Sequence, residues 1–389
     1  MLSGRDFIIF SDDWGRHPSS CQHIVRHLLD ANRVIWVNTI GMRSPQFTAY
    51  DIKRSFEKVW SWVSEKDRPA NGAENKNPIV VNPFIIPYNG VGAVRSLNRS
   101  TVVRKIKGVM DEHGIKEPIV LTTFPSTADY CGAFDEAAHI YYCVDDFIHW
   151  PGVDRKLVQS MEDELIAGCD LVLATSRELC SKKQRGGKVP VLLPHGVDFE
   201  HFSSSAEKAV PGSLVSIPGP VIGFFGAISP WLDFELITSA AKARPSWSFV
   251  FIGPADTDVA SLAACPNIHL LGSVPYGELP SYAKGFDVGI IPFLVNELTV
   301  SVNPLKLLEY LATGMPVVST GLPEVREFSG VVSIADTVED FIKGIEYSLS
   351  AECAGKKAER MNTARKHSWK SVAEDFSHVV EGLLDGVRA

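Results

Sequence analysis

The residues whose type and spacing most clearly predict chemistry are a lysine and a glutamate three positions apart, Lys306 and Glu309. Asn303 and Pro304 are typical of a helix start, with Asn303 as the N-cap, and Gly314 is typical of a helix end. Lys306 then lies in the first helical turn, where a cation opposes the helix dipole unless an anion is bound there. A diphosphate is such an anion, because backbone N–H groups and Lys306 would converge on it.

At about 100° per residue, the apolar side chains of this helix lie on one side. Its polar residues form one stripe, which consists of Lys306, Glu309, Tyr310 and Thr313. Glu309 could accept hydrogen bonds from ribose hydroxyls about one turn from the phosphates. The alternative is an ordinary surface ion pair between Lys306 and Glu309, worth about 0.2 to 0.5 kcal/mol. The spacing alone leaves both interpretations open.

Two adjacent carboxylates, Asp145 and Asp146, end the apolar run HIYYCV. In parallel sheets, ligands bind outside the carboxyl ends of the strands, so this position favours a role in a site. A carboxylate there could take the proton of an attacking hydroxyl or stabilise positive charge in a transition state. We expect at least one of the pair to be catalytic and favour Asp145; the alternative is a turn or a helix cap.

Two further loops follow predicted strands. Gly226 would let the backbone approach a phosphate closely, or it could serve only a tight turn. In the loop SDDWGRHPSS after the first strand, Arg16 and His17 could contact an acceptor or a phosphate. His17 could instead be a histidine that faces solvent.

The elements that must position these residues are short apolar strands separated by helical lengths. Because the runs are apolar throughout, they predict parallel sheets buried on both faces. The predicted strands are 7–10, 34–38, 118–124, 139–144, 171–176 and 189–194, then 221–229, 247–254, 267–274, 286–293, 315–320 and 331–335.

A chain of 389 residues is longer than one compact core usually accommodates. The stretch 201–220, which is rich in small and polar residues, interrupts the regular recurrence of predicted strands. We therefore predict an N-terminal Rossmann-like domain over 1–205. A second Rossmann-like domain would follow over 206–370, and a C-terminal helix over 371–389 could pack back on the first domain.

The segment PLKLLEYLATGMPVVST (304–320) resembles the signature of family 4 and related GT-B glycosyltransferases. Other segments resemble the same enzymes and occur in the same order along the chain, over roughly residues 5–375. They are YYCVDDF, LLPHGVDFEHF, VIGFFGAISPWLDFELI and SFVFIGP. The resemblance implies an α/β GT-B fold, with two doubly wound Rossmann-like domains facing a central cleft. It implies that the domain over 1–205 binds the acceptor and the domain over 206–370 binds the nucleotide-sugar donor. It also implies a nucleotide-sugar-dependent, hexosyltransferase-like enzyme of bacterial exopolysaccharide, capsule or cell-wall glycan assembly, with Lys306 and Glu309 on the donor.

The resemblance also marks departures and further contacts. Ser301 stands where these enzymes commonly carry a first glutamate, so Ser301 or Asn303 would replace its contact with the donor. The nucleobase would meet backbone groups near Val274, with Tyr276 stacking nearby, although Tyr276 could equally be ordinary packing. The donor would be a UDP sugar or a related nucleotide sugar. The acceptor would be a saccharide or a lipid-linked saccharide.

Composition excludes several other classes. The seven cysteines show no zinc-binding spacing, and no GxGxxG follows the first strand, which argues against a Rossmann dehydrogenase. We expect no metal and no cofactor beyond the nucleotide-sugar co-substrate. The net charge of -8 and the absence of a recognised module argue against nucleic-acid binding. No signal peptide or apolar run of about 18 residues is evident, so we expect a cytoplasmic protein.

Residues 43–108 form a basic island of 12 Lys and Arg against 5 Asp and Glu. With interspersed aromatic and aliphatic residues, the island could dock on an anionic membrane surface, which would make the protein peripheral on the inner face of the cytoplasmic membrane. A solvated helix face is the alternative.

Two other functions fit the same architecture. One is a nucleotide-sugar epimerase, which would isomerise the donor without an acceptor. The other is a catalytically silent protein that binds a nucleotide sugar, made conceivable by the missing first glutamate.

Overall fold

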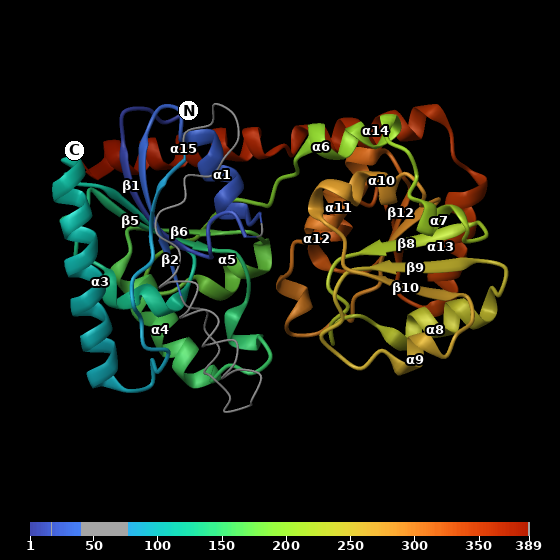
Figure 1. Cartoon of the computed structure of the whole chain (residues 1–389), viewed down its shortest axis with the longest axis horizontal. Helices are drawn as coiled ribbons and strands as arrows, with labels where there is room; N and C mark the ends of the chain where they lie inside the picture. Colours follow the sequence, from blue (N-terminus) through green and yellow to red (C-terminus); the bar gives the residue numbers. More distant parts are fainter. Residues whose placement is uncertain (17, 40–76, 388–389) are drawn as a thin grey trace. The chain divides into compact units, whose positions relative to one another are not determined.

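The computed structural model describes residues 1–16, 18–39 and 77–387. The chain forms two compact units, coloured along the sequence in Figure 1. The N-terminal unit comprises residues 1–193 and 373–389, and the C-terminal unit comprises 194–372. His17 and the part of the basic island before residue 77 lie outside the described residues.

The N-terminal unit is built on a seven-stranded sheet in the order β3-β2-β1-β4-β5-β6-β7, in which every pairing is parallel. The consecutive residues Phe7, Ile8, Ile9 and Phe10 are all fully buried, as is Trp36, so the sheet is covered on both faces. The strands are β1 (Asp6–Ser11), β2 (Arg33–Asn38), β3 (Ile79–Val81), β4 (Ile119–Thr122), β5 (Ala138–Cys143), β6 (Leu171–Ala174) and β7 (Val191–Leu192).

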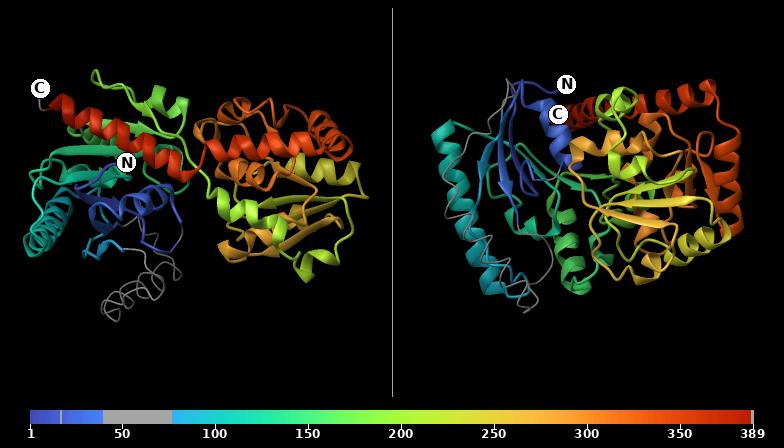
Figure 2. Two further views of the ribbon diagram at one scale, coloured as in Figure 1. Left: turned by 90° about the horizontal axis from the view of Figure 1, so that it is seen from above. Right: turned by 45° about the vertical axis from the view of Figure 1, so that its right-hand side comes forward.

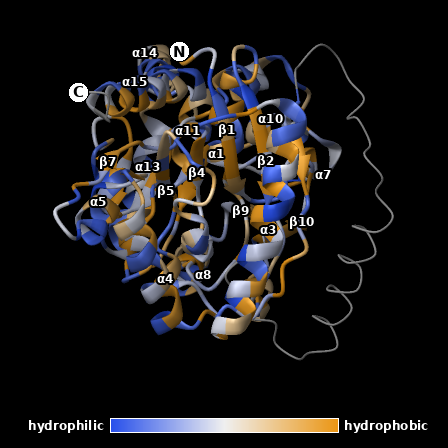
Figure 3. Cartoon of the chain, turned by 90° about the vertical axis from the view of Figure 1, so that its left-hand side faces the viewer, coloured by the Kyte–Doolittle hydropathy of each residue, from blue (hydrophilic) through white to orange (hydrophobic). Residues whose placement is uncertain are grey.

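One face of this sheet packs against α3 through Val102, Ile106 and Met110, which recur every four residues along the helix. Figure 3 shows the resulting contrast between hydrophobic strands and helices of mixed polarity. The other helical elements of this unit are α1 (Ser20–Leu28), η1 (Pro125–Tyr130), η2 (Phe147–His149), α4 (Arg155–Gly168) and α5 (Arg177–Lys183), with α3 at Gly92–His113.

The C-terminal unit has a six-stranded parallel sheet in the order β10-β9-β8-β11-β12-β13. The strand order reverses at β8, with β9 and β10 on one side of it and β11 to β13 on the other, and α/β proteins bind ligands at such a switch point. The strands are β8 (Val221–Phe225), β9 (Ser248–Ile252), β10 (Ile268–Gly272), β11 (Val288–Ile291), β12 (Val317–Thr320) and β13 (Ser333–Ala335).

Helices cover both faces of this second sheet (Figures 1 and 2). α8 contacts α9 and α13, whereas α11 contacts α6, α10 and α14. The bounds are α6 (Phe199–Ser203), α7 (Gly212–Val215), α8 (Phe234–Ala243), α9 (Ala260–Ala263), α10 (Leu279–Ala283), α11 (Leu305–Thr313), α12 (Pro323–Arg326), α13 (Val338–Ser350) and α14 (Ala354–Lys366), with short 3-10 turns η3 (Ser204–Glu207), η4 (Tyr276–Glu278) and η5 (Thr299–Ser301).

Every predicted strand is present, and the sequence missed only β3 among the described strands. β3 is three residues long and lies at the sheet edge, where its short run IVV carries little pattern. The division between the units falls after Leu193, whereas the sequence placed it after residue 205. Phe199 and Phe202 explain the difference, because both are buried in the core of the C-terminal unit.

The last helix, α15 (Trp369–Val387), begins two residues before the predicted start at 371, and Ser368 Oγ accepts a hydrogen bond from the Ser371 amide. Its residues from 373 onward group with the N-terminal unit. No helix in the described ranges is both long and apolar enough to cross a bilayer. All seven cysteines are free thiols.

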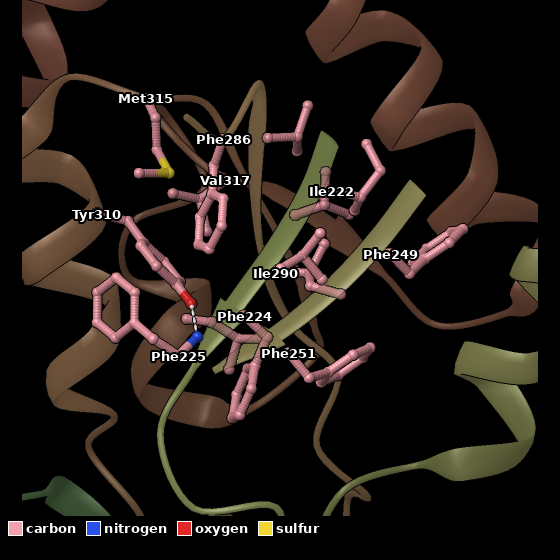
Figure 4. Close-up of a cluster of buried hydrophobic side chains, with 14 of the residues drawn as sticks. Ile222, Phe224, Phe225, Phe249, Phe251, Phe286, Ile290, Tyr310, Met315 and Val317 are labelled. Carbon is pink, nitrogen blue, oxygen red and sulfur yellow. Dashed lines mark hydrogen bonds between the residues drawn. The ribbon is translucent and has the colours of Figure 1, made fainter. Parts of the chain in front are cut away.

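Tyr310 corrects the predicted polar stripe, because its ring is fully buried rather than exposed. The ring packs edge-on to Phe225 at 4.7 Å between centroids, and its hydroxyl accepts a 3.1 Å hydrogen bond from the Phe225 amide (Figure 4). A buried tyrosine is stable when its hydroxyl finds such a partner. Tyr310 therefore ties α11 to β8.

We expect Tyr310→Phe to lower the free energy of unfolding by about 1 to 3 kcal/mol, because the buried Phe225 amide would lose its partner. The matched control is Tyr347→Phe, since Tyr347 is 57% exposed and its hydroxyl bonds only the surface amine of Lys356. Urea unfolding of the two variants measures the difference. Equal stability of both variants would contradict this role for Tyr310.

Candidate functional site

The helix that carries Lys306 and Glu309 begins one residue later than predicted. Pro304 is the N-cap of α11, no side chain caps the helix, and Asn303 precedes it. The prediction of Asn303 as N-cap is thus wrong by one position. Gly314 ends the helix in the left-handed conformation, with φ 82°, as predicted. Without a side-chain cap, the first turn of α11 leaves backbone N–H groups for another partner.

Lys306 reaches across the switch point of the C-terminal sheet. Its Nζ lies 5.4 Å from the ring centroid of Phe224 in β8 and 5.8 Å from that of Phe293, two residues after β11. Aromatic faces attract a cation at such distances. Among the residues that the structure describes, no carboxylate lies within 4 Å of this ammonium group, and no hydrogen bond to it is formed.

Gly226 makes room for the lysine. A Cβ at this position would stand 2.1 Å from Lys306 Cε and 2.6 Å from its Nζ, closer than atoms can pack. The glycine also adopts φ 136°, a conformation that L side chains rarely take. Gly226 and Lys306 are therefore neighbours, and the substitution of either residue changes the space available to the other.

Burial shifts the ionisation of both α11 residues against their charged forms. It lowers the pKa of Lys306, opposed only by attraction to Glu309. It raises the pKa of Glu309 from 4.5 to about 7, opposed by attraction to Lys306. The two side chains do not form an ion pair within 4 Å, so the surface pair that the spacing allowed is not present. Partly buried charges without partners are typical of binding sites.

In the described part of the chain, no hydrogen bond, ion pair or ring contact joins Lys306 to the other predicted donor residues. Ser301 is fully buried at the end of η5. Val274 packs against the core of the C-terminal unit. The Tyr276 ring stacks on His201 with 4.7 Å between centroids and 16° between planes, so packing already occupies one of its faces. Their roles in donor binding stay predictions.

The two adjacent aspartates after β5 have different surroundings. Asp146 is 1% exposed, and its carboxylate lies 3.1 Å from Nζ of both Lys182 and Lys183 and 3.8 Å from His149 Nε2. Burial alone would raise its pKa, but Lys183 above all, together with Lys182, lowers it. Asp146 is thus a paired anion held within the fold.

Asp145 accepts hydrogen bonds at both carboxylate oxygens. Oδ1 accepts from the Asp146 amide at 2.8 Å, and Oδ2 accepts from Trp150 Nε1 at 2.9 Å. Burial nevertheless raises its pKa from 3.8 to about 6, and these hydrogen bonds partly oppose the rise. A carboxyl group that titrates near neutral pH suits general base chemistry better than an ordinary aspartate does. The sequence did not indicate Lys183 or Trp150 as site residues, because neither spacing nor residue type links them to Asp145.

The loop after β1 contributes Arg16, which is exposed and lies 3.3 Å from the Asp13 carboxylate. Asp12 accepts hydrogen bonds from Ser19 Oγ and Gln22 Nε2, both at 2.7 Å, and so braces the loop. His17 lies outside the described residues. Within the described ranges, no three His, Cys, Asp or Glu side chains are grouped to hold a metal.

Comparison with known proteins matches the C-terminal unit to a family. Residues 219–351 match the family described as glycosyl transferases group 1. The chain is also 33% identical over 229 residues to the "Putative teichuronic acid biosynthesis glycosyltransferase TuaH" of Bacillus subtilis (strain 168). That match covers 55% of this chain and 57% of the relative, so it spans little more than half the relative's length.

Solved structures resemble the whole chain. Anabaena Alr3699/HepE in complex with UDP and glucose has a TM-score of 0.63 at 13% identity, covering 96% of this chain and 99% of that one. Sucrose-phosphate synthase from Thermosynechococcus elongatus has a TM-score of 0.69 at 11% identity, covering 98% and 100%. The likeness confirms the predicted GT-B fold class, with its two parallel-sheet α/β domains.

We expect Glu309→Gln to be more stable than the wild type at about pH 8. The folded-state pKa of Glu309, about 7, lies above the ordinary 4.5, so the folded protein binds the extra proton and loses stability as pH rises through this window. Glutamine has no charge to desolvate. The gain should shrink at about pH 5, where the glutamate is mostly protonated in the fold.

Thermal unfolding at both pH values measures the effect, with Glu278→Gln as the exposed control. If Glu309→Gln is no more stable than the wild type at about pH 8, burial does not destabilise the charged form of Glu309.

Proposed function

We propose that this chain transfers a sugar from a nucleoside diphosphate donor to a saccharide or lipid-linked saccharide acceptor, in the assembly of a bacterial surface polysaccharide. The observation that carries the proposal is the ammonium group of Lys306, which is enclosed beside Gly226 and the start of α11, where no side chain caps the helix. Among the described residues, it has no carboxylate partner within 4 Å. An anion such as a diphosphate completes this arrangement. The match of 219–351 to glycosyl transferases group 1 supports the same assignment.

UDP is the nucleotide we propose for the donor, because it is bound in the similar Anabaena structure and UDP-2-fluoro glucose in the similar trehalose-6-phosphate structure from E. coli. Glu309 would accept hydrogen bonds from the ribose. Asp145 would accept the proton of the acceptor hydroxyl as its oxygen attacks the anomeric carbon. The departing diphosphate takes the electron pair of the broken bond, and Lys306 stabilises that charge.

The positive charge of Lys306 and of the helix start supports a reaction that needs no divalent metal, because both would stabilise the leaving diphosphate. No observation favours the epimerase or the silent binding protein. The family and the Bacillus subtilis relative are both described as glycosyltransferases.

Lys306→Ala should weaken UDP binding by roughly 10- to 100-fold, since a hydrogen bond to a charged group contributes about 1.5 to 3 kcal/mol. Titration calorimetry measures the affinity, with EDTA present throughout. Lys343→Ala, which removes an exposed lysine from α13 of the same unit, is the control and should bind UDP like the wild type. Unchanged affinity of Lys306→Ala for UDP, GDP and ADP alike would refute the donor site.

A membrane surface is the second partner we propose, at the described end of the basic island. Phe84, Tyr88, Val91 and Leu97 are exposed large apolar side chains, with Phe84 at 61% and Leu97 at 54%. The Asn98 side chain bonds both the amide and the carbonyl of Ile86, which fixes this loop against α3. α3 also carries Arg99, Arg104, Lys105 and Lys107, a charge that favours anionic lipid.

The double variant Phe84→Ser and Leu97→Ser should bind anionic phosphatidylglycerol vesicles at least ~10-fold more weakly than the wild type, because each apolar side chain contributes about 1.5 to 3 kcal/mol when fully buried. Vesicle sedimentation measures the bound fraction. The control is Val215→Ser, which removes a 69% exposed valine from the C-terminal unit. Equal binding by the double variant and the control would exclude this surface.

A further inference from the structure

The turn after β5 folds back so that Trp150 reaches the aspartate five residues before it. Backbone hydrogen bonds from His149 to Asp146 and from Trp150 to Phe147 close the 3-10 turn η2. The indole N–H then donates to Asp145 Oδ2 at 2.9 Å. The other oxygen, Oδ1, accepts a hydrogen bond from the Asp146 amide. The short loop from Asp145 to Trp150 therefore holds both carboxylate oxygens and fixes their orientation.

Packing holds the indole in place. The Trp150 ring lies 5.0 Å from that of Phe147, which in turn lies 5.5 Å from Phe124 after β4. Phe147 is buried, and its cluster includes Val158 and Met161 of α4. The indole N–H is therefore presented by a rigid aromatic group, and little conformational freedom is lost when it meets a carboxylate.

A buried ion cluster holds the second donor, the Asp146 amide. Lys183 Nζ, itself 1% exposed, lies 3.1 Å from Asp146 and 2.8 Å from Glu162, and Lys182 also pairs with Asp146. Tyr141 donates its hydroxyl to Glu162 at 2.8 Å. Removal of one partner from such a cluster leaves an uncompensated buried charge. The cluster thus joins Asp146 to β5, α4 and α5.

We propose that Trp150 is a positioning residue for Asp145, and that the ion cluster of Asp146, Glu162, Lys182 and Lys183 fixes the backbone from which both residues project. The inference rests on the proposed function, in which Asp145 receives the acceptor proton. The indole holds one carboxylate oxygen so that the lone pairs left over face the acceptor hydroxyl.

The charged and titratable groups around Asp145 influence its pKa. Asp146 and Glu162 carry negative charge, Lys182 and Lys183 balance it, and His149 and the thiol of Cys143 complete the surroundings. Because the cluster is close to neutral overall, burial dominates the rise in the Asp145 pKa to about 6. The indole N–H opposes that rise, since a hydrogen bond to the charged form favours it.

Trp150→Phe removes the N–H and keeps an aromatic ring against Phe147. We expect the pKa of Asp145 to rise by about one pH unit in this variant, which corresponds to one hydrogen bond to a charged group. Carboxyl-13C aspartate NMR of the full chain measures it, with the Asp145→Asn variant to assign the signal. UDP affinity should stay unchanged, because the donor residues lie in the other unit.

A second measurement needs no change at Trp150. In the wild type, the indole 15N–1H signal of Trp150 should titrate with a midpoint near pH 6, and Asp145→Asn should abolish that titration. A tryptophan that only packs would lower stability when replaced, with no effect on the aspartate. An unshifted pKa of Asp145 in a folded Trp150→Phe variant, or a Trp150 signal that does not titrate, would overturn the inference.

Failure of the proposed function gives a different result. If Asp145→Asn transfers sugar as fast as the wild type, Asp145 is not the base, even where the indole titration is observed. If Asp145→Asn is inactive but the indole does not titrate, the base assignment stands and the positioning role of Trp150 is lost.

Discussion

The main constraint on the C-terminal unit is the enclosed ammonium group of Lys306, which has no carboxylate within 4 Å among the residues that the structure describes. It is held over the rings of Phe224 and Phe293, at the point where the sheet order reverses between β8 and β11. Desolvation without a carboxylate partner disfavours the charged lysine, so the arrangement costs stability. The surrounding packing compensates for that cost. Tyr310 ties α11 to β8, and Gly226 leaves the space that the lysine fills.

In the N-terminal unit, by contrast, buried charges form ion pairs. Asp146 and Glu162 are more deeply buried than Lys306, yet lysine partners balance both. Asp145, the residue immediately before Asp146, has hydrogen bonds only, and burial raises its pKa to about 6. Adjacent residues of one type thus acquire different chemistry, because low dielectric surroundings amplify the difference between a salt bridge and a neutral donor.

The comparisons bear on the two units unequally. The match to glycosyl transferases group 1 lies wholly within the C-terminal unit, which contains Lys306 and Glu309. Similar structures extend over both units at identities of 11 to 13%, and they establish the fold alone. The proposal that the N-terminal unit carries the acceptor chemistry therefore rests on the local environment of Asp145.

The sequence by itself determined the two parallel sheets, nearly every described strand, and the helix that carries Lys306, because apolar runs and glycine or proline boundaries are local signals. It also located Asp145 at a strand end. Tertiary structure decided what local pattern cannot encode. It placed Tyr310 inside the core through a hydrogen bond to β8, assigned residues 194–205 to the C-terminal unit, and gave Asp145 and Asp146 different surroundings. Each of these outcomes depends on partners distant in sequence, or on side chains that only the folded chain brings into contact.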